Sequence, residues 1–193
     1  IATSSRKKII TDYEVQKALE AKTKRFSKYN DALNKMIKQG DIIISTSGKK
    51  VGQINGLTIP VSGDCSFGQP VRITANTFIG KSGVLNIERE VSMSGKSHSK
   101  GVFILSAYIG EKYAQDIPLS LTASICFEQL YNPIDGDSAS STELYAILSS
   151  LADIPINQSL AVTGSVNQKG EIQPIGGVTD KIEGFFKVCK EKG

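Results

Sequence analysis

The chain has 193 residues, of which 39% are hydrophobic and 22% charged. This composition is typical of a folded protein of one good-sized domain and excludes a disordered chain. No apolar run reaches the ~18 residues of a membrane-spanning helix, so we expect no membrane span. The few cysteines and the single histidine, His98, form no ligand motif. They argue against a structural zinc site and favour a reducing, cytoplasmic location. Because the sequence begins at Ile1, we expect a piece of a longer chain.

Positive charge is concentrated near the start of the sequence. Residues 1–50 carry 12 lysines and arginines against 5 aspartates and glutamates, whereas residues 51–193 carry 11 against 14. A basic segment can bind the phosphates of nucleic acid. However, aromatic residues are few and no nucleic-acid-reading motif is present. We therefore interpret the charge as the solvated side of a helix and do not favour nucleic acid as a partner.

The first predicted element is a helix from about residue 12 to residue 38. Thr11 and Glu14 form the Thr-x-x-Glu pattern of a capping box, and Gly40 follows as a C-terminal stop. Apolar residues at helical spacing mark its later buried stripe: Phe26, Tyr29, Leu33, Met36 and Ile37. We place a domain boundary near residues 40–50, between a helical arm (1–40) and a second domain (41–193).

Short strands make up much of the second domain. They are predicted at residues 41–45, 51–59, 71–75, 83–87, 91–94, 120–127, 159–166 and 171–175. A helix is predicted at 100–114, with Val102, Leu105 and Ile109 on its core face, and another from about Thr179 onward. Strands mixed with helices in this order indicate an α+β fold.

Two Gly-Lys-Ser triplets, at residues 80–82 and 95–97, resemble the end of a phosphate-binding loop. That motif also needs a glycine five positions before its second glycine, where this sequence has Ala75 and Glu90. We therefore expect no cofactor in this chain. ATP with magnesium would be needed only by a module elsewhere.

A serine flanked by a glycine and two carboxylates stands just before a further predicted helix. The apolar stripe of that helix consists of Leu144, Ile147, Leu148 and Leu151, and Pro155 bounds its far end. Asp135, Asp137 or Ser138 could each cap it. Alternatively, Ser138 could be a nucleophile, because the free N–H groups and positive dipole of a helix start stabilise an alkoxide or oxyanion.

A serine nucleophile here would need a base other than histidine, because one histidine makes a Ser-His-Asp triad improbable. Lys181 falls in the first turns of the last helix, just after Gly176 and Gly177. An ordinary lysine, with a pKa of ~10.4, is almost fully protonated near neutral pH. Burial and the positive end of a helix both lower that pKa. A neutral Lys181 could then accept the proton of Ser138.

These motifs resemble those of the Lon proteases. The stretch Asp135-Gly136-Asp137-Ser138-Ala139-Ser140 is similar to the Glu-Gly-Asp-Ser-Ala-Ser nucleophile motif of B-type and bacterial Lon-like proteases, with aspartate for glutamate. The segments 162–166 and 170–181 resemble the part of the family that ends in its catalytic lysine. Residues 51–57 and 91–95 also look like the family, so the resemblance covers most of residues 40–193.

The resemblance implies a role for each matching residue. Ser138 would be the nucleophile, Lys181 its general base, and Thr163 the hydroxyl that orients the lysine amine. Gly136 would allow a tight turn. Asp135 and Asp137 match acidic positions beside the nucleophile, where they could tune the lysine, block an inactive site or only cap the helix. The implied fold is the α+β fold of domain 2 of ribosomal protein S5.

The resemblance also implies an assembly. Lon proteolytic domains are serine endopeptidases with a Ser-Lys dyad that act on unfolded or regulatory polypeptides. They normally form a ring of six, fed by an ATPase module of the AAA+ class, and residues 1–40 resemble the helical end of such a module. They usually continue with another strand and helix, which we expect beyond Gly193. The alternative is a catalytically silent Lon-like scaffold.

Overall fold

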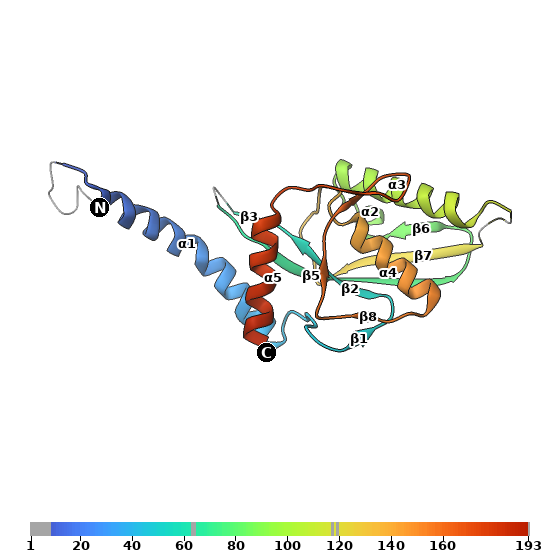
Figure 1. Cartoon of the computed structure of the whole chain (residues 1–193), viewed down its shortest axis with the longest axis horizontal. Coiled ribbons are helices and arrows are strands. Elements are labelled where there is room, and N and C mark those ends of the chain that lie inside the picture. Colours follow the sequence, from blue (N-terminus) through green and yellow to red (C-terminus); the bar gives the residue numbers. More distant parts are fainter. Residues whose placement is uncertain (1–8, 63–64, 117, 119, 193) are drawn as a thin grey trace.

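Helices and strands are mixed along the chain in an α+β arrangement (Figure 1). The computed structural model describes residues 9–62, 65–116, 118 and 120–192, apart from the side chains of residues 23, 25–27, 29, 61, 62 and 65. The helices are α1 (Asp12–Gln39), α2 (Ile87–Glu90), α3 (Lys96–Tyr113), α4 (Ser140–Ala152) and α5 (Val178–Lys192). The strands are β1 (Lys49–Lys50), β2 (Gln53–Thr58), β3 (Val61–Ser62), β4 (Cys65–Ser66), β5 (Gln69–Ile79), β6 (Gly83–Asn86), β7 (Leu121–Glu128), β8 (Ile156–Asn157), β9 (Ala161–Val162), β10 (Ser165–Val166) and β11 (Ile172–Gln173).

A mixed sheet of five strands, in the order β6-β7-β5-β2-β9, forms the centre of the structure. β5 pairs antiparallel with β7 and with β2, while β6 and β9 run parallel to their neighbours at the two edges. Side chains alternate between the two faces of each strand. Ile73 lies opposite Phe127, and both are buried, whereas Arg72 lies opposite Glu128 and both are half-buried. One face of the sheet is therefore apolar.

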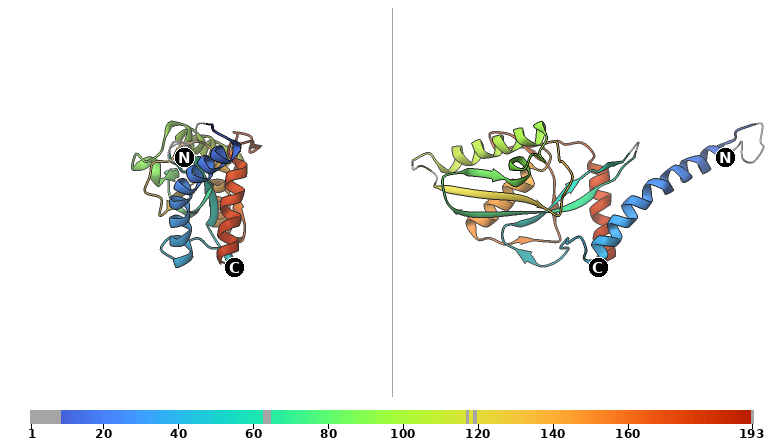
Figure 2. Two further views of the ribbon diagram at one scale, coloured as in Figure 1. Left: turned by 90° about the vertical axis from the view of Figure 1, so that its left-hand side faces the viewer. Right: turned by 180° about the vertical axis from the view of Figure 1, so that it is seen from behind.

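α3 and α4 pack on the apolar face. Val102, Leu105 and Ile109 of α3 are buried at the predicted three- and four-residue spacing, and Leu144 and Ile147 of α4 join the same cluster. Full burial of one such side chain contributes about 1.5–3 kcal/mol. α4 lies in front of the sheet in Figure 1, and Figure 2 (right) shows the strands from the opposite side, with α4 behind them. The packing of α3 and α4 on the sheet therefore fixes the position of the N-terminal end of α4.

α1 begins and ends as the sequence predicts. Thr11 and Glu14 form the capping box, and Gly40 ends the helix in the left-handed region, with a φ of 88°. The helix extends away from the sheet, and its C-terminal end lies beside α5 (Figures 1 and 2). There Ile37 is buried in a small cluster with Ile44 and Val188. The division into an arm (1–40) and a second domain (41–193) stays a prediction.

The predicted stripe of α1 is correct only in part. Ile37 is buried, but Met36 is 40% exposed, and the side chains of Phe26 and Tyr29 lie outside the described residues. The predicted strand at 41–45 is wrong. Its Ile44 fills the space between α1 and α5 instead of facing a strand partner.

Two other predicted strands differ from the structure. At residues 91–94 the chain turns, and Ser94 alone forms an isolated bridge with Ile134. The single strand predicted at 159–166 is divided into β9 and β10. The break falls at Thr163 and Gly164, which bond to the segment that carries Ser138.

α5 approaches the start of β5 through two glycines. A Cβ atom on Gly184 would lie 2.0 Å from the carbonyl oxygen of Gly68, and one on Gly68 would lie 2.0 Å from the carbonyl oxygen of Asp180. Both positions therefore need glycine, because any side chain would separate the two segments. The inward face of α5 carries Lys181 and Val188, which are both buried.

We expect the substitution Gly184→Ala to move α5 away from Gly68. The free energy of unfolding should fall by about 1–3 kcal/mol, as for other overpacked contacts. Gly110→Ala in α3 is the matched control, because a Cβ there meets nothing within 4 Å and alanine favours a helix by up to about 1 kcal/mol. Urea unfolding followed by circular dichroism measures both variants. Equal stability of the two would contradict the close-contact interpretation.

Candidate active site

Ser138 lies in the turn that joins β7 to α4. Gly136 adopts a φ of 85°, a left-handed conformation that favours glycine and agrees with the tight turn expected there. α4 begins at Ser140 with Ala139 as its N-cap residue, and no side chain caps it. The alternative that Asp135, Asp137 or Ser138 only caps this helix is therefore excluded in this structure. Instead, the backbone N–H and the hydroxyl of Ser140 both donate to the carbonyl of Asp137, at 3.0 and 2.8 Å.

Residues 162–164 form hydrogen bonds with the serine turn and the start of α4. The N–H of Gly164 donates to the carbonyl of Ser138 at 2.7 Å, and the N–H of Ser141 donates to the carbonyl of Gly164 at 3.0 Å. The hydroxyl of Thr142 donates to the carbonyl of Val162 at 2.9 Å. The chain between β9 and β10 thus satisfies backbone groups around the serine instead of continuing a strand.

Lys181 projects from the second turn of α5 toward the same turn. Its Nζ lies 3.0 Å from Oγ of Ser138 and 2.9 Å from Oγ1 of Thr163. The Thr163 hydroxyl donates to the carbonyl of Ser138 at 3.1 Å. The structure thus brings together three residues that are distant in the sequence, from the turn before α4, the break between β9 and β10, and α5.

Burial changes the acidity of the lysine. Lys181 is 3% exposed, and this desolvation lowers the pKa of its amine, since removal of water disfavours the charged form. In the part of the chain that the structure describes, no carboxylate forms an ion pair with Lys181 to oppose the effect. The site therefore favours a neutral amine next to a hydroxyl.

Asp135 caps α3, not α4. Its Oδ1 accepts hydrogen bonds from the backbone N–H groups of Ser97 and His98, at 3.0 and 3.2 Å, in the first turn of α3. The backbone N–H of Gly136, followed by that of His98, holds the pKa of Asp135 below its ordinary value. The Asp135 carboxylate therefore fixes the serine turn to the start of α3.

Asp137 joins the turn to two further elements. Its Oδ2 accepts a hydrogen bond of 2.7 Å from the hydroxyl of Ser165 in β10. Its Cβ lies 3.3 Å from the place that a Cβ on Gly101 of α3 would take. Neither Asp137 nor Asp135 pairs with Lys181 in the described residues, so both carboxylates act on the shape of the turn in this structure.

The helix predicted at 100–114 begins four residues earlier than the sequence indicated. α3 begins at Lys96, so His98 lies on the helix and is 2% exposed. Its Nδ1 is 2.7 Å from the hydroxyl of Ser94, and its Nε2 is 3.3 Å from Oε1 of Glu143 in α4. The signal was present in the sequence. His98 stands four residues before Val102, on the stripe that predicted the core face.

Glu143 is the second residue of this network that sequence reasoning missed. Its side chain is buried in the first turns of α4, and Oε1 also accepts a 3.0 Å hydrogen bond from Nδ2 of Asn86. Burial raises the pKa of the Glu143 carboxyl, and His98 partly opposes this effect. The buried contact between His98 and Glu143 ties α3 to α4 beside the serine turn.

Neither a cluster of metal-ligand residues nor a helix that could span a membrane is found among the described residues. No group of three or more histidine, cysteine, aspartate or glutamate side chains among them could hold a metal ion. None of the described helices is both long enough and apolar enough to cross a bilayer.

Comparison with known proteins identifies a family. Residues 46–187 match the family model of the Lon protease C-terminal proteolytic domain. A putative Lon protease homolog of Escherichia coli is 44% identical over 158 residues, which cover 81% of this chain and 27% of that protein. A putative Lon protease homolog of Haemophilus influenzae is 40% identical over 86% of this chain and 27% of its own length. An archaeal Lon protease of Pyrococcus abyssi is 31% identical over the whole chain and 19% of its own length. The chain thus spans about a quarter of the length of these curated relatives.

We expect Glu143→Ala to lower the free energy of unfolding by about 3 kcal/mol, because it leaves His98 and Asn86 buried without their partner. Glu143→Gln keeps the acceptor for Asn86 and should cost about 1 kcal/mol or less. Urea unfolding of both variants near neutral pH measures the difference. Equal free energies of unfolding for the Glu143→Ala and Glu143→Gln variants would contradict a stabilising role for the acceptor oxygen at this position.

Proposed function

The chain belongs to the family of Lon protease C-terminal proteolytic domains, and we propose that it is a serine endopeptidase with Ser138 as nucleophile and Lys181 as general base. The observation that supports this proposal is the contact of the buried Lys181 amine with Oγ of Ser138 at 3.0 Å. A general base must lie within hydrogen-bond reach of the proton that it removes. Thr163 orients the amine through its own contact of 2.9 Å.

The proposed reaction has two halves. The neutral Lys181 amine takes the proton of the Ser138 hydroxyl while Oγ attacks the peptide carbonyl, and a tetrahedral oxyanion forms. The lysine ammonium then gives its proton to the departing amine, the carbon–nitrogen bond breaks, and an acyl-serine ester remains. Water, deprotonated by the neutral amine, attacks the ester, and the acid product leaves as Ser138 regains a proton.

Backbone N–H groups at the turn can stabilise the oxyanion. The N–H groups of Ser138 and Ala139 donate to no acceptor within the described part of the chain, and both stand directly before α4, where the positive end of the helix dipole lies. Donors of this kind contribute about 3–4 kcal/mol to catalysis in other serine hydrolases. We assign the oxyanion site to this pair.

The whole protein's activity is part of the same proposal. Its substrates are unfolded or regulatory polypeptides in the cytoplasm, delivered by an ATPase module of the AAA+ class outside this chain, and the proteolytic domains assemble as a ring of six. We also assign the chain to the ribosomal protein S5 domain 2-like fold, with α1 as the end of the ATPase module. The basis for these points is the resemblance of the motifs and the presence of both members of the dyad.

We expect Ser138→Ala and Lys181→Met each to lower kcat/KM for a fluorogenic peptide by about a thousand-fold or more, because each removes one member of a unit that acts together. Methionine fills the space of the lysine stem without an amine. Cleavage is measured with the full-length protein on the peptide and on unfolded casein.

Ser106→Ala and Lys190→Ala are matched controls on exposed or half-buried positions of α3 and α5, and both should cleave at the wild-type rate. Circular dichroism establishes that each variant is folded. Wild-type turnover in either dyad variant would rule out the assignment. A folded, assembled wild-type protein that cleaves no peptide would instead favour the scaffold alternative.

A further inference from the structure

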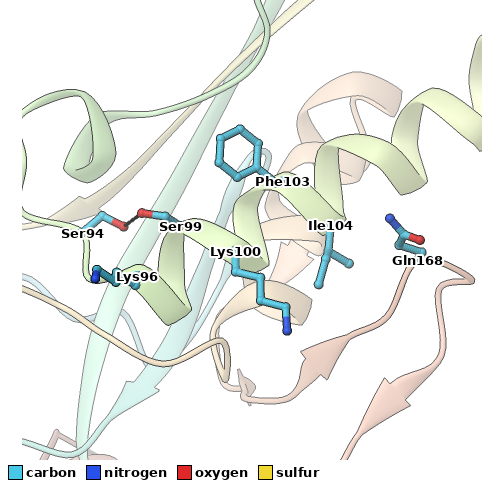
Figure 3. A pocket seen from close by; sticks show the side chains of 7 residues that line it. All are labelled: Ser94, Lys96, Ser99, Lys100, Phe103, Ile104 and Gln168. Atoms are coloured by element: carbon cyan, nitrogen blue, oxygen red, sulfur yellow. Dashed lines mark hydrogen bonds between the residues drawn. The ribbon is translucent and has the colours of Figure 1, made fainter.

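A pocket of about 460 Å³ lies on the outer side of α3, near its N-terminal end (Figure 3). Its lining consists of Ser94, Lys96, Ser99, Lys100, Phe103, Ile104 and Gln168. In Figure 3, Lys100 and Ile104 point to the same side of the helix, toward the loop that carries Gln168, and Phe103 points to the other side. The pocket therefore combines two cations, an amide and two apolar side chains.

The charge of the lining is entirely positive. Lys96 and Lys100 are exposed and have no ion-pair or hydrogen-bond partner among the described residues, and no carboxylate lines the pocket. At its edge the guanidinium of Arg89 lies 4.9 Å from the centre of the Phe103 ring, but it is paired with the carboxylate of Glu90 at 2.9 Å. An anionic group that enters the pocket would thus meet the unpaired charges of Lys96 and Lys100.

The two chain segments that line the pocket also contact Asp137 of the serine turn. Gly101 follows Lys100 in α3, and a Cβ there would lie 3.3 Å from the Cβ of Asp137, the residue before Ser138. Gln168 comes three residues after Ser165, whose hydroxyl bonds to the same aspartate. α3 and the loop after β10 therefore meet Asp137 from two sides, and the pocket lies where they meet.

The two carboxylates of the serine turn, Asp135 and Asp137, already accept hydrogen bonds from other groups. Asp135 accepts hydrogen bonds from the N–H groups of Ser97 and His98, and Asp137 accepts one from Ser165. Neither one forms an ion pair with Lys96 or Lys100 in the described residues. The two lysines remain available to a ligand from outside the domain.

We propose that this pocket binds an acidic side chain of the polypeptide substrate and gives the proposed peptidase a preference for aspartate or glutamate near the bond that it cleaves. The carboxylate contacts the ammonium group of Lys100 and accepts a hydrogen bond from the amide of Gln168, while Lys96 adds positive charge at the other end of the pocket. The methylene groups of the acidic residue pack on Ile104. This inference rests on the proposed function, because it assigns a specificity site to the same reaction.

The test uses the full-length protein and fluorogenic peptides that are identical except for glutamate or glutamine at each of the positions close to the cleaved bond. We expect kcat/KM to be about tenfold higher for glutamate than for glutamine at one position, which corresponds to one favourable, partly buried charge contact. The double variant Lys96→Gln/Lys100→Gln should bring that ratio close to one. Lys112→Gln, which removes an exposed lysine of α3 outside the pocket, should leave the ratio unchanged.

A wild-type ratio near one at every position would overturn the proposal, and so would an unchanged ratio in the double variant. Fluorescence anisotropy of the same peptides on the Ser138→Ala variant separates this inference from the dyad assignment. Stronger binding of the glutamate peptide, lost in the Lys96→Gln/Lys100→Gln background, would support the pocket even if the wild type cleaved nothing. Equal binding of both peptides, together with normal cleavage, would reject the pocket and retain the peptidase.

Discussion

The contact on which the proposed chemistry depends joins the amine of Lys181 to the hydroxyl of Ser138, 43 residues earlier in the chain. Several features of the fold are needed to make it. α5 must approach β5 closely, which the glycines at 68 and 184 permit. The chain between β9 and β10 must leave the sheet so that Thr163 reaches both partners. Burial must remove water, because only a neutral amine can accept the serine proton.

The serine turn is held on several sides before any substrate arrives. Asp135 fixes it to the start of α3, Gly164 bonds to the carbonyl of Ser138, and the buried contact of His98 with Glu143 ties α3 to α4. Such support keeps a reactive group within a narrow range of geometry. The carboxylates next to Ser138 are thus engaged in shaping the turn, which leaves the lysine without a counter-charge and favours its neutral form.

Local patterns in the sequence were sufficient for the parts of the structure that depend on neighbouring residues. The capping box at Thr11, the stripe of α3 and the tight turn at Gly136 follow from short-range rules. The motif around Ser138 and Lys181 also named the two residues that meet. What the sequence could not reveal depends on distant partners: Asp135 caps a helix that begins 39 residues earlier, and the strand at 159–166 breaks because its backbone bonds to the serine turn.

The most direct test of the central claim is the titration of the Lys181 amine itself by nitrogen-detected NMR of lysine-labelled protein, with Lys181→Met to assign the signal. We expect a pKa below the ordinary lysine value of 10.5, because burial without a paired carboxylate disfavours the ammonium. The neutral fraction should then rise with pH over the same range in which peptide cleavage rises. A pKa at or above 10.5 would leave Lys181 charged under working conditions and would contradict its role as the base.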